Sequence, residues 1–273
     1  MMKKKVFYLV PLLLVLGAAG IASAITNNWV VGGTDDWNTP ANWSMGHVPY
    51  NGALNATGYA DILNEEAKIN GATGTGPVIG VGDVVSAYRV FVGSTGYGEL
   101  TIDGGTLLTN GYMTSAYVVT TTSALVTMKS GTVQIGFTGG TNGHWYLGRY
   151  GATTFNMSGG DFTIMNDLNI GQYASGNGTV NISGGTLTAS TLKKTGTAHI
   201  DITGSGKLVL LGDDTAVVST WIGNGWMTGN GNDYDIQYDY NITTPGATTV
   251  FVPEPATICL LGIGLFGLIR RRK

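Results

Sequence analysis

A motif of alternating apolar residues around a glycine pair recurs through the middle of the chain and constrains its fold more than any other feature. Its copies begin at Leu100, Val126, Phe155, Val180 and Ile200. Units of about 20–30 residues that repeat along a chain are typical of a solenoid, in which each unit contacts only its neighbours.

Aligning the copies produces four columns of mostly apolar residues. Because side chains alternate between the two faces of a strand, each column is expected to point into the core. The first two columns are Leu100, Val126, Phe155, Val180, Ile200 and Ile102, Met128, Met157, Ile182, Ile202. The other two are Leu107, Val133, Phe162, Leu187, Leu208 and Thr109, Ile135, Ile164, Ala189, Leu210.

Each unit is expected to contain three short strands. A further apolar position upstream of each copy marks the first strand, at Val92, Val118, Leu147, Ile170 and Leu192. The glycine pair between the second and third strands allows the positive φ of a tight corner. We therefore predict an all-β fold, a right-handed parallel β-helix over residues 61–214, with strands about 4.8 Å apart. An antiparallel sandwich is the rival fold, but it does not explain the constant distance to the third strand.

Aromatic residues cluster on both sides of the repeats. Residues 25–60 contain Trp29, Trp37 and Trp43, and we interpret them as a cap over the open core rather than as a sugar-binding surface. Residues 215–251 are expected to form a second cap, with Trp221, Trp226 and three tyrosines, followed by an extended linker. Residues 60–90 are less regular, and Ile62, Leu63, Ile69, Val78, Ile79 and Val85 are expected to add one or two coils.

Residues 1–24 have the pattern of a secretory signal peptide. Three lysines precede an apolar run at residues 6–16, and small residues, Ala22 and Ala24, occupy the cleavage positions. Pro11 interrupts the run, which is short for a membrane anchor. We predict that signal peptidase cleaves after Ala24.

Residues 252–273 combine a short motif, an apolar run and a basic end. Pro253, Glu254 and Pro255 precede the apolar residues 256–269, and Arg270, Arg271, Arg272 and Lys273 follow. The basic end predicts a transmembrane helix whose C-terminus stays in the cytoplasm. The run is shorter than the roughly 20 residues of an ordinary span, so it requires interfacial residues or a thinned bilayer.

This tail, residues 252–273, resembles the PEP-CTERM sorting signal of Gram-negative bacteria. The resemblance implies that an exosortase, a membrane protease-transpeptidase, recognises and removes the tail. It also implies a connection with surface polysaccharide and biofilm. The body is similar to the glycine-rich repeats of autotransporter-like passenger domains, which are β-helical, and the stretch around Trp37 and Trp43 is similar to the cap that precedes such repeats.

Charge and cysteine content exclude several functions. Residues 25–269 contain seven basic and 17 acidic residues, a net charge of −10. No basic patch is available for a phosphate backbone, so we expect no nucleic-acid partner. The single cysteine, Cys259, excludes an internal disulfide and a cysteine-based metal site.

The sequence contains no recognisable set of catalytic residues, and we expect no enzymatic activity and no cofactor. The carboxylates within the repeats do not form an adjacent pair suited to sugar cleavage. The three histidines, His47, His144 and His199, lack metal-ligand spacing, and we expect no metal. Asp233, Asp235 and Asp239 could offer oxygen ligands, but a solvated acidic loop is the simpler interpretation.

Tyr150 and Tyr173 occupy matching positions, each two residues after a glycine. On adjacent coils they would form an outward aromatic step on which a sugar can stack, although an ordinary exposed ladder is the preferred interpretation. The sequence therefore predicts an exported, non-enzymatic protein of the cell surface or biofilm matrix, held transiently in the inner membrane. The alternative is a β-helix that binds or cleaves extracellular polysaccharide.

Overall fold

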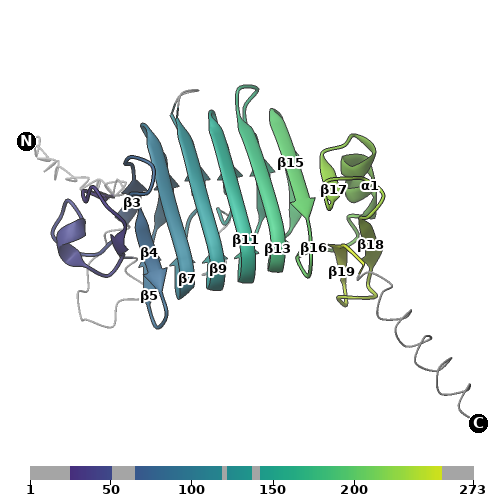
Figure 1. Cartoon of the computed structure of the whole chain (residues 1–273), viewed down its shortest axis with the longest axis horizontal. Coiled ribbons are helices and arrows are strands. Elements are labelled where there is room, and N and C mark those ends of the chain that lie inside the picture. The colour runs from purple at the N-terminus through teal and green to yellow at the C-terminus, as the bar shows by residue number, and fades with distance from the viewer. Residues whose placement is uncertain (1–24, 51–64, 119–121, 137–141, 254–273) are drawn as a thin grey trace, which may run out of the picture.

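The chain stacks short strands into a β-solenoid of about six turns with a cap at each end (Figure 1). The computed structural model describes residues 25–50, 65–118, 122–136 and 142–253. The predictions for the signal peptide, for Ile62 and Leu63, and for residues 254–273 lie outside these ranges. Within the described residues, no helix is both long and apolar enough to span a membrane.

One wall of the solenoid is a parallel sheet built from the first strand of each coil. In the described residues it has 7 strands in the order β1-β3-β6-β8-β10-β12-β14. Their bounds are β1 (Ile25–Asn28), β3 (Glu65–Ile69), β6 (Arg89–Val92), β8 (Met113–Ser115), β10 (Trp145–Leu147), β12 (Asp167–Ile170) and β14 (Thr191–Lys194).

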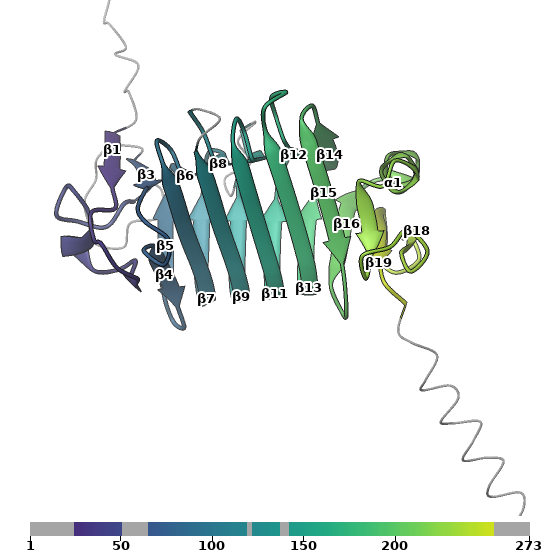
Figure 2. The same ribbon diagram turned by 45° about the horizontal axis from the view of Figure 1, so that its top comes forward.

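The other wall is a sheet of 12 strands in the described residues, which faces the viewer in Figure 1 and lies in front of β6, β8, β12 and β14 in Figure 2. Four strands of 13 residues form its centre, namely β7 (Tyr97–Thr109), β9 (Ser123–Ile135), β11 (Ala152–Ile164) and β13 (Asn177–Ala189). Toward the ends, the same path is divided into β4 (Pro77–Gly80) with β5 (Val84–Ala87), and β15 (Thr197–Ile202) with β16 (Lys207–Leu211); β2 (Asp35–Asp36) lies at the N-terminal edge.

All four predicted columns are confirmed. Phe155 pairs with both Val126 and Val180 in parallel register, and Phe162 pairs with Val133 and Leu187. Every member of the columns is buried. Parallel pairing between coils also excludes the antiparallel sandwich. The ladder brings large side chains into contact, and the rings of Trp145 and Phe162 stack with centroids 4.6 Å apart.

The predicted corner between the second and third strands is wrong, because each long strand continues through the glycine pair. The pairing of β11 with β13 shifts in register on either side of Ser158, so the strand bends at a bulge without ending. Gly160 has φ +83°, and a Cβ there would lie 2.5 Å from the carbonyl oxygen of Gly131 on the previous coil. Glycine is therefore needed both for its conformation and for the close approach of the backbones.

One of the predicted upstream positions is also wrong. Val118 is exposed, and Ser115 lies in register with Val92 instead. Leu192 is buried in β14, as expected, although it pairs with Leu168 rather than with Ile170. A constant spacing fails here because the corners between the first and second strands differ in length.

The N-terminal cap buries its tryptophans, as predicted. Trp29, Trp37 and Trp43 are nearly inaccessible to solvent. A 3₁₀ turn, η1 (Pro40–Asn42), brings Trp43 back onto Trp37, and the indole Nε1 of Trp43 donates to the Trp37 carbonyl at 2.8 Å. Ile69, Ile79 and Val85 join the same core, which confirms a coil ahead of the clear repeats. Val78 does not join it, because it alternates with the buried Pro77 and Ile79 in β4 and lies on the outer face.

The C-terminal cap consists of α1 (Thr215–Gly223), β17 (Met227–Gly229), β18 (Gln237–Tyr240) and β19 (Ala247–Phe251). Trp221 is buried, whereas Tyr234, Tyr238 and Tyr240 are exposed, so the expected burial of aromatics holds only in part. The expected linker is wrong as well. β19 is a buried strand that pairs antiparallel with β16 and β18, and it thereby covers the edge of the last coil.

Candidate functional site

Aromatic and arginine side chains gather beside the seven-stranded sheet, where each first strand of a coil ends. We define the arginine–tyrosine cluster as Arg149 together with Tyr117, Tyr146, Tyr150 and Tyr173. Tyr146 lies in β10 and alternates with the buried Trp145 and Leu147, so its side chain is on the outer face. The other four residues follow the ends of β8, β10 and β12.

The corners after these strands turn through positive φ. Ala116, Gly148 and Gly171 each follow a first strand directly and have φ of +51°, +69° and +62°. Tyr117 comes directly after the first of these corners, and Tyr173 comes two residues after the last. Successive corners stack along the solenoid and thereby place residues from three coils side by side.

The structure stacks Tyr150 on Tyr173, the pair that the sequence placed in matching positions. Their ring centroids lie 4.2 Å apart with an angle of 7° between the planes. Tyr173 is 39% exposed, and Tyr150 is partly exposed. The two rings therefore cover one face of each other, and the rest of the pair remains partly open to solvent.

Arg149 lies at the centre of the cluster, and no pattern in the sequence singled it out. The guanidinium carbon is 4.7 Å from the ring centre of Tyr117, 5.3 Å from Tyr146, 5.8 Å from Tyr150 and 5.7 Å from Tyr173. Cation–π attraction of this kind stabilises a positive charge that has lost part of its water. The only signal in the sequence was the position of Arg149 directly before Tyr150.

A neighbouring group on the same face resembles the cluster but has its own carboxylate. Arg89 lies 4.5 Å from the rings of both Tyr88 and Tyr112. Its Nη1 donates to Oε1 of Glu66 at 3.1 Å, so the positive charge is neutralised within the protein. The ring of Tyr112 contacts that of Tyr146 edge-on at 5.6 Å and connects the two groups.

The hydroxyl groups of the cluster have shifted acidities. Hydrogen bonds from Tyr150 and Arg149 lower the pKa of Tyr173 below its ordinary value of 10.0. The pKa of Tyr150 is raised, chiefly because its hydroxyl donates a hydrogen bond to Tyr173. Arg149 and Tyr150 thus both point their donors at one phenolic oxygen.

Arg149 differs from most basic residues of the body in having no carboxylate partner among the described residues. Four others make ion pairs, namely Lys68 and Arg89 with Glu66, Lys129 with Asp103, and Lys193 with Asp167. A cation without such a partner, in a body of net charge −10, is the notable electrostatic feature of this face.

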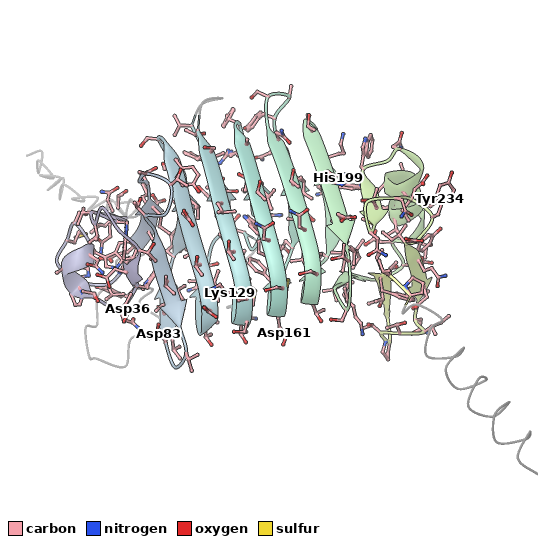
Figure 3. All side chains as sticks on the ribbon, viewed as in Figure 1. Asp36, Asp83, Lys129, Asp161, His199 and Tyr234 are labelled. Carbon is pink, nitrogen blue, oxygen red and sulfur yellow. The ribbon has the colours of Figure 1, made fainter. Side chains whose placement is uncertain are left out.

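Other polar side chains are dispersed over the molecule. Figure 3 shows Lys129, Asp161 and His199 spread over the large sheet and Tyr234 in the C-terminal cap. The carboxylate of Asp235 accepts hydrogen bonds from Asn230 and Asn232, and that of Asp239 accepts from Thr243. In the described part of the chain, no three His, Cys, Asp or Glu side chains gather closely enough to hold a metal ion.

The sorting motif follows the last strand of the solenoid. Pro253 lies two residues beyond the end of β19, and Glu254, Pro255 and the basic end fall outside the described residues, as do Ala22 and Ala24. Residues 251–273 match the family model of the PEP-CTERM protein-sorting motif. No curated protein and no solved structure matches the chain.

Proposed function

We propose that this protein is a non-enzymatic structural component of the cell surface or biofilm matrix. The chain carries a PEP-CTERM sorting motif at residues 251–273, which implies an exported protein that an exosortase processes. One observation supports the proposed structural role: the motif directly follows a solenoid that is closed by a cap at each end. A closed solenoid projects as a rigid body from whatever holds its C-terminus.

The proposed route has three steps. A signal peptide at residues 1–24 directs export, and signal peptidase removes it after Ala24. An apolar helix at residues 256–269 then holds the chain in the inner membrane, with Arg270–Lys273 in the cytoplasm. The exosortase finally removes the tail and releases or attaches the right-handed solenoid outside.

The mass of the exported protein tests this route. The wild type should lack both the signal peptide and the tail, whereas a variant with Pro253, Glu254 and Pro255 replaced by alanine should keep the tail. Pro245→Ala, which changes a proline outside the motif, is the matched control and should be processed normally. A wild-type protein that retains residues 254–273 would refute processing.

Binding of an extracellular polysaccharide is a second candidate function, and the stacked rings of Tyr150 and Tyr173 favour it. In such a stack, each ring keeps one face turned away from its partner, and an exposed face of this kind offers a flat apolar surface on which a sugar ring packs. A glycan array probed with the exported protein tests this function. Selective binding that is lost in Tyr173→Ala would support it, whereas the absence of binding to every glycan would refute it.

A further inference from the structure

The strongest unassigned feature of the molecule is the unneutralised charge of Arg149 within an exposed aromatic surface. We propose that the arginine–tyrosine cluster binds an anionic sugar residue, a uronate, whose carboxylate pairs with Arg149 while its ring packs on the tyrosines. The inference rests on the second candidate function above and specifies its ligand. It does not depend on the route of export.

Two arginines on one face of the solenoid differ in whether the protein supplies a carboxylate partner. Arg89 and Arg149 both lie against tyrosine rings, at distances between 4.5 and 5.8 Å. Arg89 has Glu66 as its anion, but Arg149 has none in the described residues. Both arginines thus have aromatic neighbours, but only Arg89 has an anionic partner within the protein. We infer that an external anion binds at Arg149.

The guanidinium group of Arg149 favours a carboxylate as that anion. It presents its N–H donors in a planar fork that matches the two oxygens of a carboxylate. The acidic body repels every polyanion, but it repels a polyuronate, with one carboxylate per sugar residue, less than a polymer that carries several charges per residue. The face of Tyr173 that is turned away from Tyr150 suits the apolar face of that sugar, so charge and shape together select a uronate.

The cluster is accessible to a ligand from solvent. Tyr173 is 39% exposed, and Arg149 and the three other tyrosines are partly exposed, so a ligand can approach without rearrangement of the solenoid. The ladder of stacked coils holds these residues on rigid strand ends. A prearranged site of this kind loses little conformational freedom when it binds.

The test uses the full exported protein and oligomers of galacturonate, glucuronate and mannuronate. Methyl-esterified galacturonate, which has the same sugar ring without the negative charge, is the control ligand. Titration calorimetry should detect binding of at least one acidic oligomer and binding at least about tenfold weaker for its ester, because charge-assisted hydrogen bonds are lost. Binding should also weaken as salt is added.

Variants then locate the site. Arg149→Gln should abolish the preference for the acid over the ester, and Tyr173→Ala should weaken binding of both. Arg149→Lys, which keeps the charge but not the planar fork, should restore binding in part. Arg89→Gln is the matched control and should bind as the wild type does, and circular dichroism should confirm that each variant is folded.

The outcomes separate the two proposals. Equal binding of acid and ester, a preference for sulfated sugars, or unchanged binding in Arg149→Gln would overturn the uronate inference. If neutral sugars still bind and Tyr173→Ala removes that binding, polysaccharide binding remains supported although the uronate inference fails. If no acidic or neutral glycan binds, both fail, while the mass measurement continues to test the sorting route separately.

Discussion

Ala116 and Gly93 occupy equivalent corners on adjacent coils. The N–H of Ala116 donates to the Val92 carbonyl at 3.0 Å, and the N–H of Gly93 donates to the Ile69 carbonyl at 2.9 Å. Both residues have positive φ, +51° and +69°. This conformation costs an L-residue with a Cβ roughly 1–2 kcal/mol, whereas glycine adopts it freely.

Ala116→Gly is therefore expected to stabilise the protein. Relief of the strained φ outweighs the greater freedom of glycine in the unfolded chain, and we expect a net gain of about 0.5–1 kcal/mol. Urea unfolding followed by circular dichroism measures the change. Gly93→Ala is the reverse control and should destabilise strongly, because its Cβ would overlap the Ser123 carbonyl oxygen. A loss of stability in Ala116→Gly would contradict the strain at this corner.

Phe162→Ala is expected to destabilise the solenoid by about 3–5 kcal/mol, the usual result of removing a buried aromatic side chain. Phe162 is fully buried and contacts both Trp145 and Phe155. Thr163→Ala, which changes the neighbouring outward residue, should alter stability by no more than about 0.5 kcal/mol. Similar unfolding midpoints for the two variants would mean that the ladder is not the main support of the coils.

Thr248→Val tests how β19 closes the last coil. The buried Thr248 hydroxyl donates to the Gly212 carbonyl at 2.9 Å and accepts from the N–H of Asp214 at 2.9 Å. Valine has nearly the same shape but leaves both groups without this partner, at a cost of about 1–3 kcal/mol. Thr188→Val on the outer face is the control, and chemical denaturation should show little change for it.

Lys129→Ala is expected to have almost no effect on stability. Lys129 Nζ lies 2.9 Å from Asp103 Oδ2, but the side chains are 56% and 43% exposed. Exposed ion pairs contribute about 0–1 kcal/mol, and salt screens them. Thermal unfolding at low and high salt measures this contribution. A loss of stability well beyond this range would show that the ion pair supports the bulge in the pairing of β7 with β9.

Glu65 makes stability depend on pH. Burial raises the pKa of its carboxyl above the ordinary value of 4.5, although His47 and a hydrogen bond from Asn27 act in the opposite direction. Because this pKa is higher in the folded than in the unfolded state, the protonated Glu65 carboxyl contributes its full stabilisation below about pH 4.5. That stabilisation is lost as the pH rises through the folded pKa.

Glu65→Gln should remove this dependence. Unfolding midpoints of the wild type and the variant should diverge as the pH rises from 4 to 7, with the variant gaining relative stability. Parallel profiles for the wild type and Glu65→Gln would contradict the effect of burial.

The core of the solenoid could be predicted because its periodicity is visible in the chain. Parallel stacking puts equivalent positions of successive units in register, so aligning Leu107 with Val133 and Phe162 in the sequence also aligned them in space. The same rule predicted the stacking of Tyr150 on Tyr173. Positions outside a regular strand, such as Val118, were predicted wrongly because a corner can contain any number of residues.

The cluster around Arg149 could be predicted only in part. The matched tyrosines were visible in the sequence, but Tyr146 belongs to a strand, and Tyr117 and Arg149 follow different corners. Their meeting depends on how far each corner turns, and the sequence does not specify that angle. The contrast with Arg89 likewise depends on which carboxylate lies within reach of which arginine.

The sequence alone determined the solenoid and the destination of the chain. Repeated apolar columns require a stacked core because no single unit can bury its own apolar face, and the sorting motif is read as a linear signal. Tertiary structure decided that the glycine pair bends a continuous strand, that β19 closes the last coil, and that Arg149 keeps its charge free of a carboxylate within the described residues. These features depend on distances between backbones and side chains that are remote along the chain, and such distances exist only after the coils have stacked.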